Sequence, residues 1–325
     1  MRILLTCVAI ILSLSSRTTK AQSSTIAPGK VAVPTSAGLL HIPVRDNGLV
    51  GTLIVPNSTQ TYPGILRLGG GEGGIQVGDA ETISAEGYAV LALAYFGVEG
   101  LPADLQEVPL EYFGKAIAWM KNSPYIDSTK LAVIGISRGS TLALLLPTIY
   151  NDFDAVVAIA PSHVVWQSHY LNWDRYAVRS SLSYRGNALP FVPYDFSNKA
   201  ASALCNGKTA ACSRMYEHSL KQRQRVQDAL IPVERIRAPI LLLSGKADTM
   251  WPSSKMGDLV MRRLAKAKHP YEDRHFAYAN AGHCSINRCY DAVASAGNGM
   301  AVAGIRRQLL DFLDRHLRSK QRPHP

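Results

Sequence analysis

The chain has 325 residues, 47% of them hydrophobic, which is enough for one large α/β domain with a sizeable core. The sequence contains no internal repeat or low-complexity tract, and this composition is ordinary for a globular protein. The formal net charge is +11, but no nucleic-acid-binding motif accompanies the basic residues. The charge therefore indicates a basic solvated surface, or attraction to anionic surfaces or substrates, rather than a nucleic-acid partner.

Residues 1–21 are organised like a secretory signal. Met1 and Arg2 precede an apolar run at 3–14, and a polar stretch follows that ends in Ala21. We predict cleavage after Ala21, a mature chain that begins at Gln22, and export to a periplasm or to the extracellular space. The apolar run is short for a stable membrane anchor, so an uncleaved anchor is the less favoured alternative. Cleavage lowers the formal charge from +11 to +8, because three basic residues and no acidic residue leave.

Strand-like and helix-like runs then alternate along the chain. The Asn47-Gly48 step predicts a hairpin between strands at 38–46 and 49–56. We expect further strands at 64–70, 87–96, 130–137, 153–161, 238–245 and 271–279, and helices at 78–86, 109–122, 138–150 and 300–317. Such alternation predicts an α/β fold, a mostly parallel sheet with helices on both faces, within a single domain at 22–325.

An insertion at about 162–236 interrupts this alternation. It is rich in aromatic residues and contains one predicted helix at 215–229. A long insertion at the strand ends of such a sheet usually covers the site, so we interpret it as a cap. Most of its aromatic side chains are expected to pack into a small core of the cap itself.

The run GISRG at 135–139 fits the pattern G-x-S-x-G and lies where a buried strand turns directly into a helix. That context is typical of a nucleophile elbow, in which flanking glycines allow strand and helix to approach closely. Ser137 is therefore the predicted nucleophile. A tight turn with an idle serine is the alternative.

A serine nucleophile needs a base, and in this architecture the acid and the histidine follow the serine in that order. Asp248 comes directly after the buried strand at 238–245, and His283 follows the last predicted strand. We predict that His283 takes the proton of Ser137 and that Asp248 orients the imidazole. Among the competitors, His275 lies within a strand, and Asp154 begins a strand instead of ending one.

An oxyanion hole requires two backbone N–H groups. One is expected from Arg138, and the other from Gly71 or Glu72 in the loop LRLGGGEGG at 66–74. This loop lacks the Walker lysine and the dinucleotide spacing, so a phosphate loop is rejected. The Glu72 side chain could bond within its loop or contact Arg138.

Three further side chains near the strand ends are predicted to line the substrate pocket: His163, Trp166 and Trp251. No cofactor or metal is expected. After the signal, four cysteines remain, and the favoured pairs join neighbours in sequence, Cys205 to Cys212 and Cys284 to Cys289. A zinc site is the alternative, although the spacings lack a C-x-x-C pair.

Several segments between residues 63 and 283 resemble one family. They are LGGGEGG, GYAVLALAYFGVEGLPADLQEVPLEYF, LAVIGISRG, PSHVVWQ, IPVERIRAPILLLSGKADTMWPSSKM and YANAGH. The sequence is similar to the C-terminal domain shared by acyl-CoA thioesterases and bile acid-CoA:amino acid N-acyltransferase, within the dienelactone-hydrolase-like α/β hydrolases. The resemblance implies an α/β-hydrolase fold and a triad acting on acyl thioesters, at Ser137, Asp248 and His283.

The sequence also departs from the pattern of this family. Its thioesterases and transferases carry an N-terminal β-sandwich, whereas about forty mature residues precede the strand at 64–70 here. Serine at the nucleophile position favours hydrolysis over transfer, because the transferases tend to use cysteine. We therefore expect an exported serine hydrolase for a small acyl thioester or carboxylic ester. An acyltransferase at the same site and a non-catalytic binding protein are the alternatives.

Overall fold

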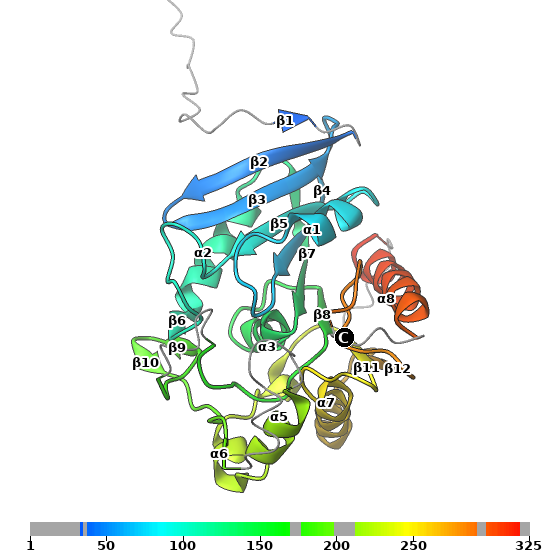
Figure 1. The fold of residues 1–325 in the computed structure, drawn as a ribbon. Helices are drawn as coiled ribbons and strands as arrows, with labels where there is room; N and C mark the ends of the chain where they lie inside the picture. Colours follow the sequence, from blue (N-terminus) through cyan, green and yellow to red (C-terminus); the bar gives the residue numbers. More distant parts are fainter. Residues whose placement is uncertain (1–32, 35–37, 170–176, 198–211, 291–296, 319–325) are drawn as a thin grey trace, which may run out of the picture.

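A nine-stranded sheet forms the centre of the computed structural model, which describes residues 33–34, 38–169, 177–197, 212–290 and 297–318 (Figure 1). The predicted signal segment lies outside these residues. The strand order is β1-β2-β3-β5-β4-β7-β8-β11-β12. Its strands are β1 Val33–Pro34, β2 Leu39–Asp46, β3 Leu49–Pro56, β4 Tyr62–Leu68, β5 Ala89–Ala94, β7 Ile126–Ile136, β8 Ala155–Ile159, β11 Ile240–Gly245 and β12 Arg274–Tyr278.

The six strands from β5 to β12 along this order pair in parallel, whereas β2 and β3 pair antiparallel to their neighbours. The β2–β3 hairpin turns at Asn47 and Gly48, which both have positive φ (49° and 80°). That conformation suits a two-residue hairpin turn, so the predicted hairpin is confirmed. All six residues of β5 are buried, as a parallel strand covered on both faces requires.

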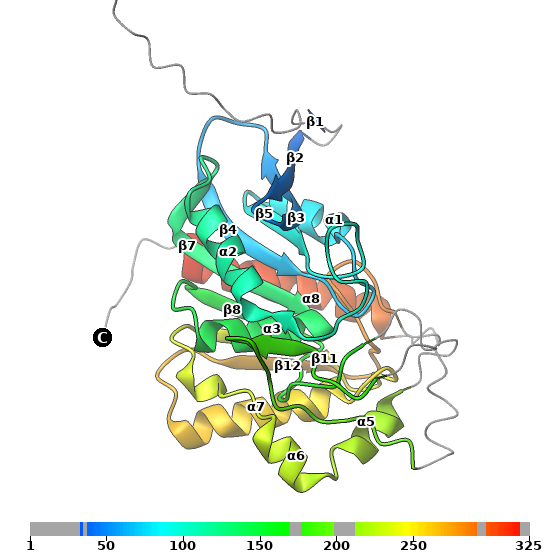
Figure 2. The same ribbon diagram turned by 90° about the vertical axis from the view of Figure 1, so that its left-hand side faces the viewer.

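Helices cover both faces of the sheet (Figures 1 and 2). The apolar sides of α2, α3 and α7 pack into the core of one face, and those of α1 and α8 pack into the core of the other. The bounds are α1 Val77–Ser84, α2 Leu110–Lys121, α3 Arg138–Leu145, α7 Ser253–Ala267 and α8 Asn298–Leu313. The predicted α/β fold with helices on both faces is confirmed.

Two helices end earlier than their sequence patterns predict. The helix α3 becomes a 3₁₀ turn at Leu146–Thr148, where Pro147 has no N–H to continue the α-helical bonding. The last helix, α8, passes into a π-helical turn at Asp314–Arg318. Among the described helices, none has the length and apolar character needed to cross a membrane.

The insertion differs most from the prediction. Two short helices, α5 (Ser213–Ser219) and α6 (Arg223–Asp228), replace the single helix expected at 215–229. The chain turns after Ser219, whose hydroxyl donates to the carbonyl of Met215 and accepts the N–H of Asp195 at 2.8 Å. Short strands that we did not predict, β9 (Leu182–Tyr184) and β10 (Asn187–Ala188), form a second sheet with β6 (Val108–Pro109).

The insertion has a small apolar core of its own. The core consists of buried residues from the insertion, closed by two residues near helix α7: Val164, Trp166, Val192, Tyr194, Met215, Tyr216, Ala229, Trp251 and Met256. Several aromatic side chains of the insertion therefore pack into this small core, as predicted from the sequence. The shared core also attaches the insertion to the loop after β11.

Candidate active site

Ser137 occupies a sharp turn between β7 and α3. Its backbone has φ 54° and ψ −118°, which is strained for a residue with a side chain. A Cβ on Gly135 would lie 1.9 Å from the carbonyl oxygen of Gly139, and a Cβ on Gly139 would lie 2.3 Å from that of Gly69. Both glycines are required because strand, helix and neighbouring loop touch here. The strand-to-helix turn predicted from GISRG thus has the backbone of a nucleophile elbow.

Asp248 and His283 meet in the loops that follow β11 and β12. The His283 Nδ1 and Asp248 Oδ2 atoms are 2.9 Å apart, and both side chains are almost fully buried. Asp248 also accepts the N–H groups of Met250 and Trp251 through Oδ1, at 3.0 and 3.1 Å, and the hydroxyl of Ser253 through Oδ2 at 2.6 Å. These donors fix the orientation of the Asp248 side chain, so that Oδ2 can accept the Nδ1–H of His283.

The two loops are held together by their backbones. The N–H of Ala247 donates to the carbonyl of Ala281 at 2.8 Å, and a Cβ on Gly245 would lie 2.1 Å from the carbonyl oxygen of Gly282. The strands β7, β8, β11 and β12 are adjacent and parallel, so Ser137 and this pair follow the same edge of the sheet. This edge is where ligands bind in open α/β sheets.

The glycine loop after β4 lies against the elbow. A Cβ on Gly70 would lie 2.5 Å from the carboxylate of Glu72 and 3.2 Å from the Cβ of Ser137, so a side chain here would displace Glu72 and press on the elbow. The hydroxyl of Tyr95 donates to the carbonyl of Gly69 at 2.7 Å, and the Glu72 carboxylate accepts the N–H of Gly70 at 3.1 Å. Glu72 therefore bonds within its loop, and among the described residues it forms no ion pair with Arg138. Which N–H of the loop serves an oxyanion stays a prediction.

His169 approaches the same loop from the insertion. Its ring hydrogen-bonds to the backbone of Gly71, and its Nε2 would lie 2.9 Å from a Cβ there. Burial, together with the nearby charge of Arg138, lowers the pKa of His169 to about 3. His169 is therefore neutral at physiological pH and contributes no charge to the loop.

The three predicted pocket residues take different places. The Trp251 ring is buried and packs edge-on against His283, with centroids 6.1 Å apart. Trp166 belongs to the core of the insertion, and its indole N–H donates to the hydroxyl of Ser162 at 2.8 Å. Burial and the charges of two arginines on α7 lower the pKa of His163 to about 4. Their contact with substrate stays a prediction.

Cys284 and Cys289 form a disulfide, which is the favoured pairing. The bridge begins at the residue after His283, and the N–H of Tyr290 donates to the carbonyl of His283 at 2.7 Å. Cys212 is also disulfide-bonded, and its predicted partner, Cys205, lies outside the described residues. The loop that carries His283 is thus closed covalently on its C-terminal side.

Sequence reasoning missed several residues that support the site. Ser253 could have been found, because it lies five positions after Asp248 at the start of a helix. Tyr95 ends an apolar strand and gave no separate signal. Tyr194 and Tyr216 contact the side chain of Arg138, but they are 56 and 78 residues away in sequence.

A second serine–histidine–aspartate arrangement lies outside the site. The hydroxyl of Ser244 is 2.8 Å from His275 Nε2, and His275 Nδ1 is 3.1 Å from Asp258. Ser244 is buried within the regular strand β11, so no turn projects its hydroxyl towards a ligand. These hydrogen bonds tie α7 to β11 and β12, and His275 lies within strand β12, as expected from the sequence.

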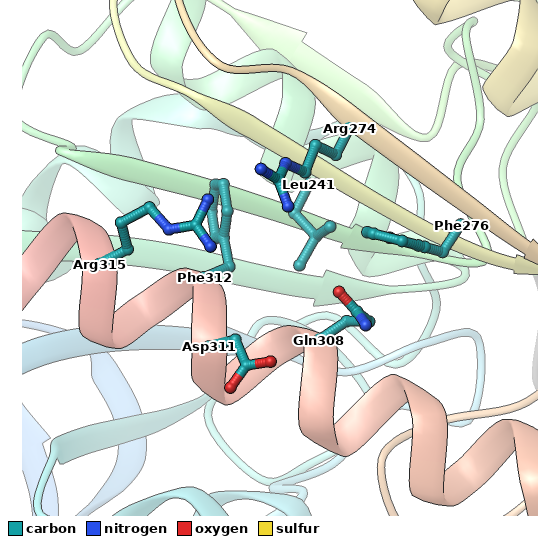
Figure 3. A pocket seen from close by; sticks show the side chains of 7 residues that line it. All are labelled: Leu241, Arg274, Phe276, Gln308, Asp311, Phe312 and Arg315. Atoms are coloured by element: carbon teal, nitrogen blue, oxygen red, sulfur yellow. The ribbon is translucent and has the colours of Figure 1, made fainter.

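A cavity of about 240 Å³ opens between the sheet and α8 (Figure 3). The residues that line it include no serine, cysteine or histidine. They are Leu241, Arg274, Phe276, Gln308, Asp311, Phe312 and Arg315. It is therefore no candidate for the proposed chemistry. Among the described residues, no group of three histidine, cysteine or acidic side chains is placed to hold a metal ion.

Comparison with known proteins gives two kinds of likeness. Residues 108–296 match the family model described as BAAT / acyl-CoA thioester hydrolase C terminal. The chain is 27% identical over 265 residues to mouse acyl-coenzyme A thioesterase 1 and 28% identical over 249 residues to human acyl-coenzyme A thioesterase 6. These alignments cover 82% and 76% of this chain but only 58% and 54% of those relatives, so the chain spans little more than half their length.

Solved structures share the fold at low sequence identity. The acylaminoacyl peptidase of Pyrococcus horikoshii superposes with a TM-score of 0.56 at 14% identity, covering 85% of this chain and 41% of that one. An α/β hydrolase from a deep-sea metagenome library superposes with a TM-score of 0.52 at 17% identity, covering 87% and 100%. The matched model spans more than half of the chain, and the chain therefore belongs to the BAAT / acyl-CoA thioester hydrolase C-terminal family, with an α/β-hydrolase fold.

Proposed function

We propose that the protein is an exported serine hydrolase that cleaves an acyl thioester or a carboxylic ester through an acyl-enzyme on Ser137. The observation that carries the proposal is the buried Asp248–His283 pair at the sheet edge that also carries Ser137 in its strained turn. The family, and relatives named as acyl-coenzyme A thioesterases, favour the thioester.

Acylation starts with His283. Its Nε2 removes the proton of the Ser137 hydroxyl while the oxygen attacks the acyl carbon, and Asp248 holds the Nδ1–H and stabilises the imidazolium. The negative charge that develops on the acyl oxygen is stabilised by the N–H of Arg138 and by that of Gly71 or Glu72. The C–S or C–O bond then breaks, and His283 gives its proton to the leaving thiol or alcohol.

Deacylation repeats these steps with water. His283 removes a proton from a water molecule that attacks the acyl-enzyme, and the Ser137 oxygen leaves and regains the proton. The products are a carboxylic acid and free enzyme. Hydrolysis is the proposed outcome because the nucleophile is a serine, whereas the transferases of the family tend to use cysteine.

Hydrolysis by purified mature protein tests the proposal. The substrates are p-nitrophenyl esters and acyl-CoA thioesters of several chain lengths, measured with the wild type and with Ser137→Ala. Ser244→Ala is the matched control, since it removes a serine that contacts a histidine outside the site. We expect Ser137→Ala to lose at least about 10⁴-fold in kcat while the control retains activity. Equal rates for wild type and Ser137→Ala would contradict the proposal.

Export is a separate part of the proposal and rests on the sequence of residues 1–21. Expression of the full chain in a secretory host, followed by N-terminal sequencing of the exported protein, tests it. We expect the mature chain to begin at Gln22. Retention in the cytosol with residues 1–21 intact would contradict export without affecting the proposed chemistry.

A further inference from the structure

The side chain of Arg138 is buried beside the candidate nucleophile. It is 5% exposed, and its guanidinium carbon lies 5.6 to 5.7 Å from the ring centroids of Tyr194, Tyr216 and Trp251. Its Nη2 donates to the hydroxyls of Tyr194 and Tyr216, the latter at 2.7 Å. Its Nη1 is buried and has no hydrogen-bond partner. We call this group of Arg138 and the three rings the arginine cage.

A second buried arginine in the described part of the chain shows what the fold does when such a charge is structural. Arg67 on β4 is 2% exposed, and its Nη2 is 2.5 Å from the carboxylate of Asp79 on α1. Among the described residues, no aspartate or glutamate pairs with Arg138. Burying an unpaired cation is costly, and aromatic faces and hydroxyls offset only part of that cost. Within the described part of the chain, the arginine cage therefore lacks an anion.

The groups around the cage do not supply that anion. Burial raises the pKa of Tyr194 and of Tyr95, so both phenols are neutral. His169, whose pKa is lowered by burial and, to a smaller extent, by the charge of Arg138, is also neutral. The cage remains positively charged at every pH at which the protein is expected to work.

The cage lies between the two halves of the candidate site. Trp251 contacts both Arg138 and His283, with ring centroids of Trp251 and His283 6.1 Å apart. On the side of the glycine loop, the charge of Arg138 interacts with the ring of His169, and this ring hydrogen-bonds to the backbone of Gly71. The guanidinium thus lies between the ring that packs against His283 and the histidine that hydrogen-bonds to the glycine loop.

We propose that Arg138 binds a carboxylate of the substrate, so that the enzyme prefers esters or thioesters that carry a free carboxylate. This inference rests on the proposed hydrolase function and narrows its substrate class. Because Nη2 is engaged by the two tyrosines, the unused Nη1 supplies the charge-assisted donor for a carboxylate in a site screened from water. The carboxylate belongs either to the acyl chain, as in half-thioesters of dicarboxylic acids, or to the leaving group.

Matched substrate pairs test the proposal. The acyl pairs are N-acetylcysteamine thioesters of succinate, glutarate and adipate, compared with those of butyrate, valerate and hexanoate. The leaving-group pair is the butyryl ester of 4-hydroxybenzoate and that of its methyl ester. For each pair the ratio of kcat/KM, charged over neutral, is measured, so that general changes in activity cancel.

We expect the wild type to prefer the charged member of one pair by about 10- to 100-fold, the range for a buried charge-assisted contact. In Arg138→Met the ratio falls to about one, and in Arg138→Lys, which keeps the charge but loses the planar guanidinium and its Nη1 donor, it falls several-fold. Arg179→Met, which removes an exposed arginine of the insertion, keeps the wild-type ratio. An unchanged ratio in Arg138→Met, or no preference in the wild type, would overturn the proposal.

A binding measurement separates this inference from the proposed function. Adipate and hexanoate are each added to Ser137→Ala and to the double variant Ser137→Ala/Arg138→Lys, and thermal melting is followed. Adipate should stabilise the first protein clearly more than the double variant, and hexanoate should not distinguish them, even if no substrate is hydrolysed. If wild type hydrolyses no substrate and Ser137 reacts with no serine probe, the function fails. If adipate binds both variants equally, the carboxylate site fails.

Discussion

Replacement of Asp248 by asparagine is the sharpest perturbation that the geometry of the acid–base pair allows. The Asp248 carboxylate accepts four hydrogen bonds, two from backbone N–H groups through Oδ1 and two from Ser253 and His283 through Oδ2. The backbone donors are fixed, so the amide oxygen of asparagine must face them. The amide NH₂ then faces Ser253 and His283.

This orientation forces the wrong histidine tautomer. The Ser253 hydroxyl can rotate to accept the amide N–H, but His283 can accept it only if Nδ1 is unprotonated. The proton then sits on Nε2, which can no longer take the proton of Ser137. We expect kcat to fall by about 10⁴-fold, or about 5.5 kcal/mol in activation free energy, as for the corresponding change in serine proteases. The melting temperature should change far less.

The assay is steady-state hydrolysis of a p-nitrophenyl ester, with thermal melting to confirm folding. Asp258→Asn is the matched control, because Asp258 contacts His275 at 3.1 Å outside the site. That variant should keep kcat within about twofold, as expected for a surface change. If Asp248→Asn retains more than a tenth of the wild-type kcat while folded, the assignment of Asp248 is wrong.

Three other consequences can be measured. Gly139→Ala places a Cβ 2.3 Å from a carbonyl oxygen of the loop after β4. We therefore expect a large fall in melting temperature, measured by circular dichroism, and a large fall in activity, measured by the ester assay. Replacing both Cys284 and Cys289 by serine should lower the free energy of unfolding by about 2 kcal/mol and lower kcat through His283; unchanged kcat would contradict the second effect. The pKa of His163 is about 4 in the folded protein, compared with the ordinary value of 6.5 expected in the unfolded chain. Because the unfolded chain binds the proton first, the stabilisation is complete above pH 6.5 and declines as pH falls towards 4. The share of this loss due to His163 should be about 3 kcal/mol in urea unfolding, so the decline between pH 6.5 and 4 should be smaller by that amount in His163→Phe, while the share due to His169 remains.

Local signals explain why so much of the framework was predictable. The Asn-Gly step set the hairpin, and continuous apolar runs marked the buried strands that carry Ser137 and Asp248. Each of these features depends on residues adjacent in sequence. The order of serine, acid and histidine then followed from the architecture.

The contacts that were not predictable join distant segments. The tyrosines around Arg138 come from the insertion, whose composition indicated a cap but not which ring faces which residue. Three consecutive glycines at 69–71 left the register of the loop open, and the contact of Gly70 with Ser137 is visible only once the turn is folded. The two short helices at 213–228 depend on Ser219 bonding to a residue 24 positions away.

The central claim is that Ser137 is an activated nucleophile. The most direct measurement is the stoichiometry of labelling by a fluorophosphonate, with the modified residue located by peptide mass spectrometry. We predict one label per chain on Ser137 in the wild type, none in Ser137→Ala, and strongly slowed labelling in His283→Ala. Absence of label on Ser137 in the folded wild-type protein, or equal labelling rates with and without His283, would contradict the account.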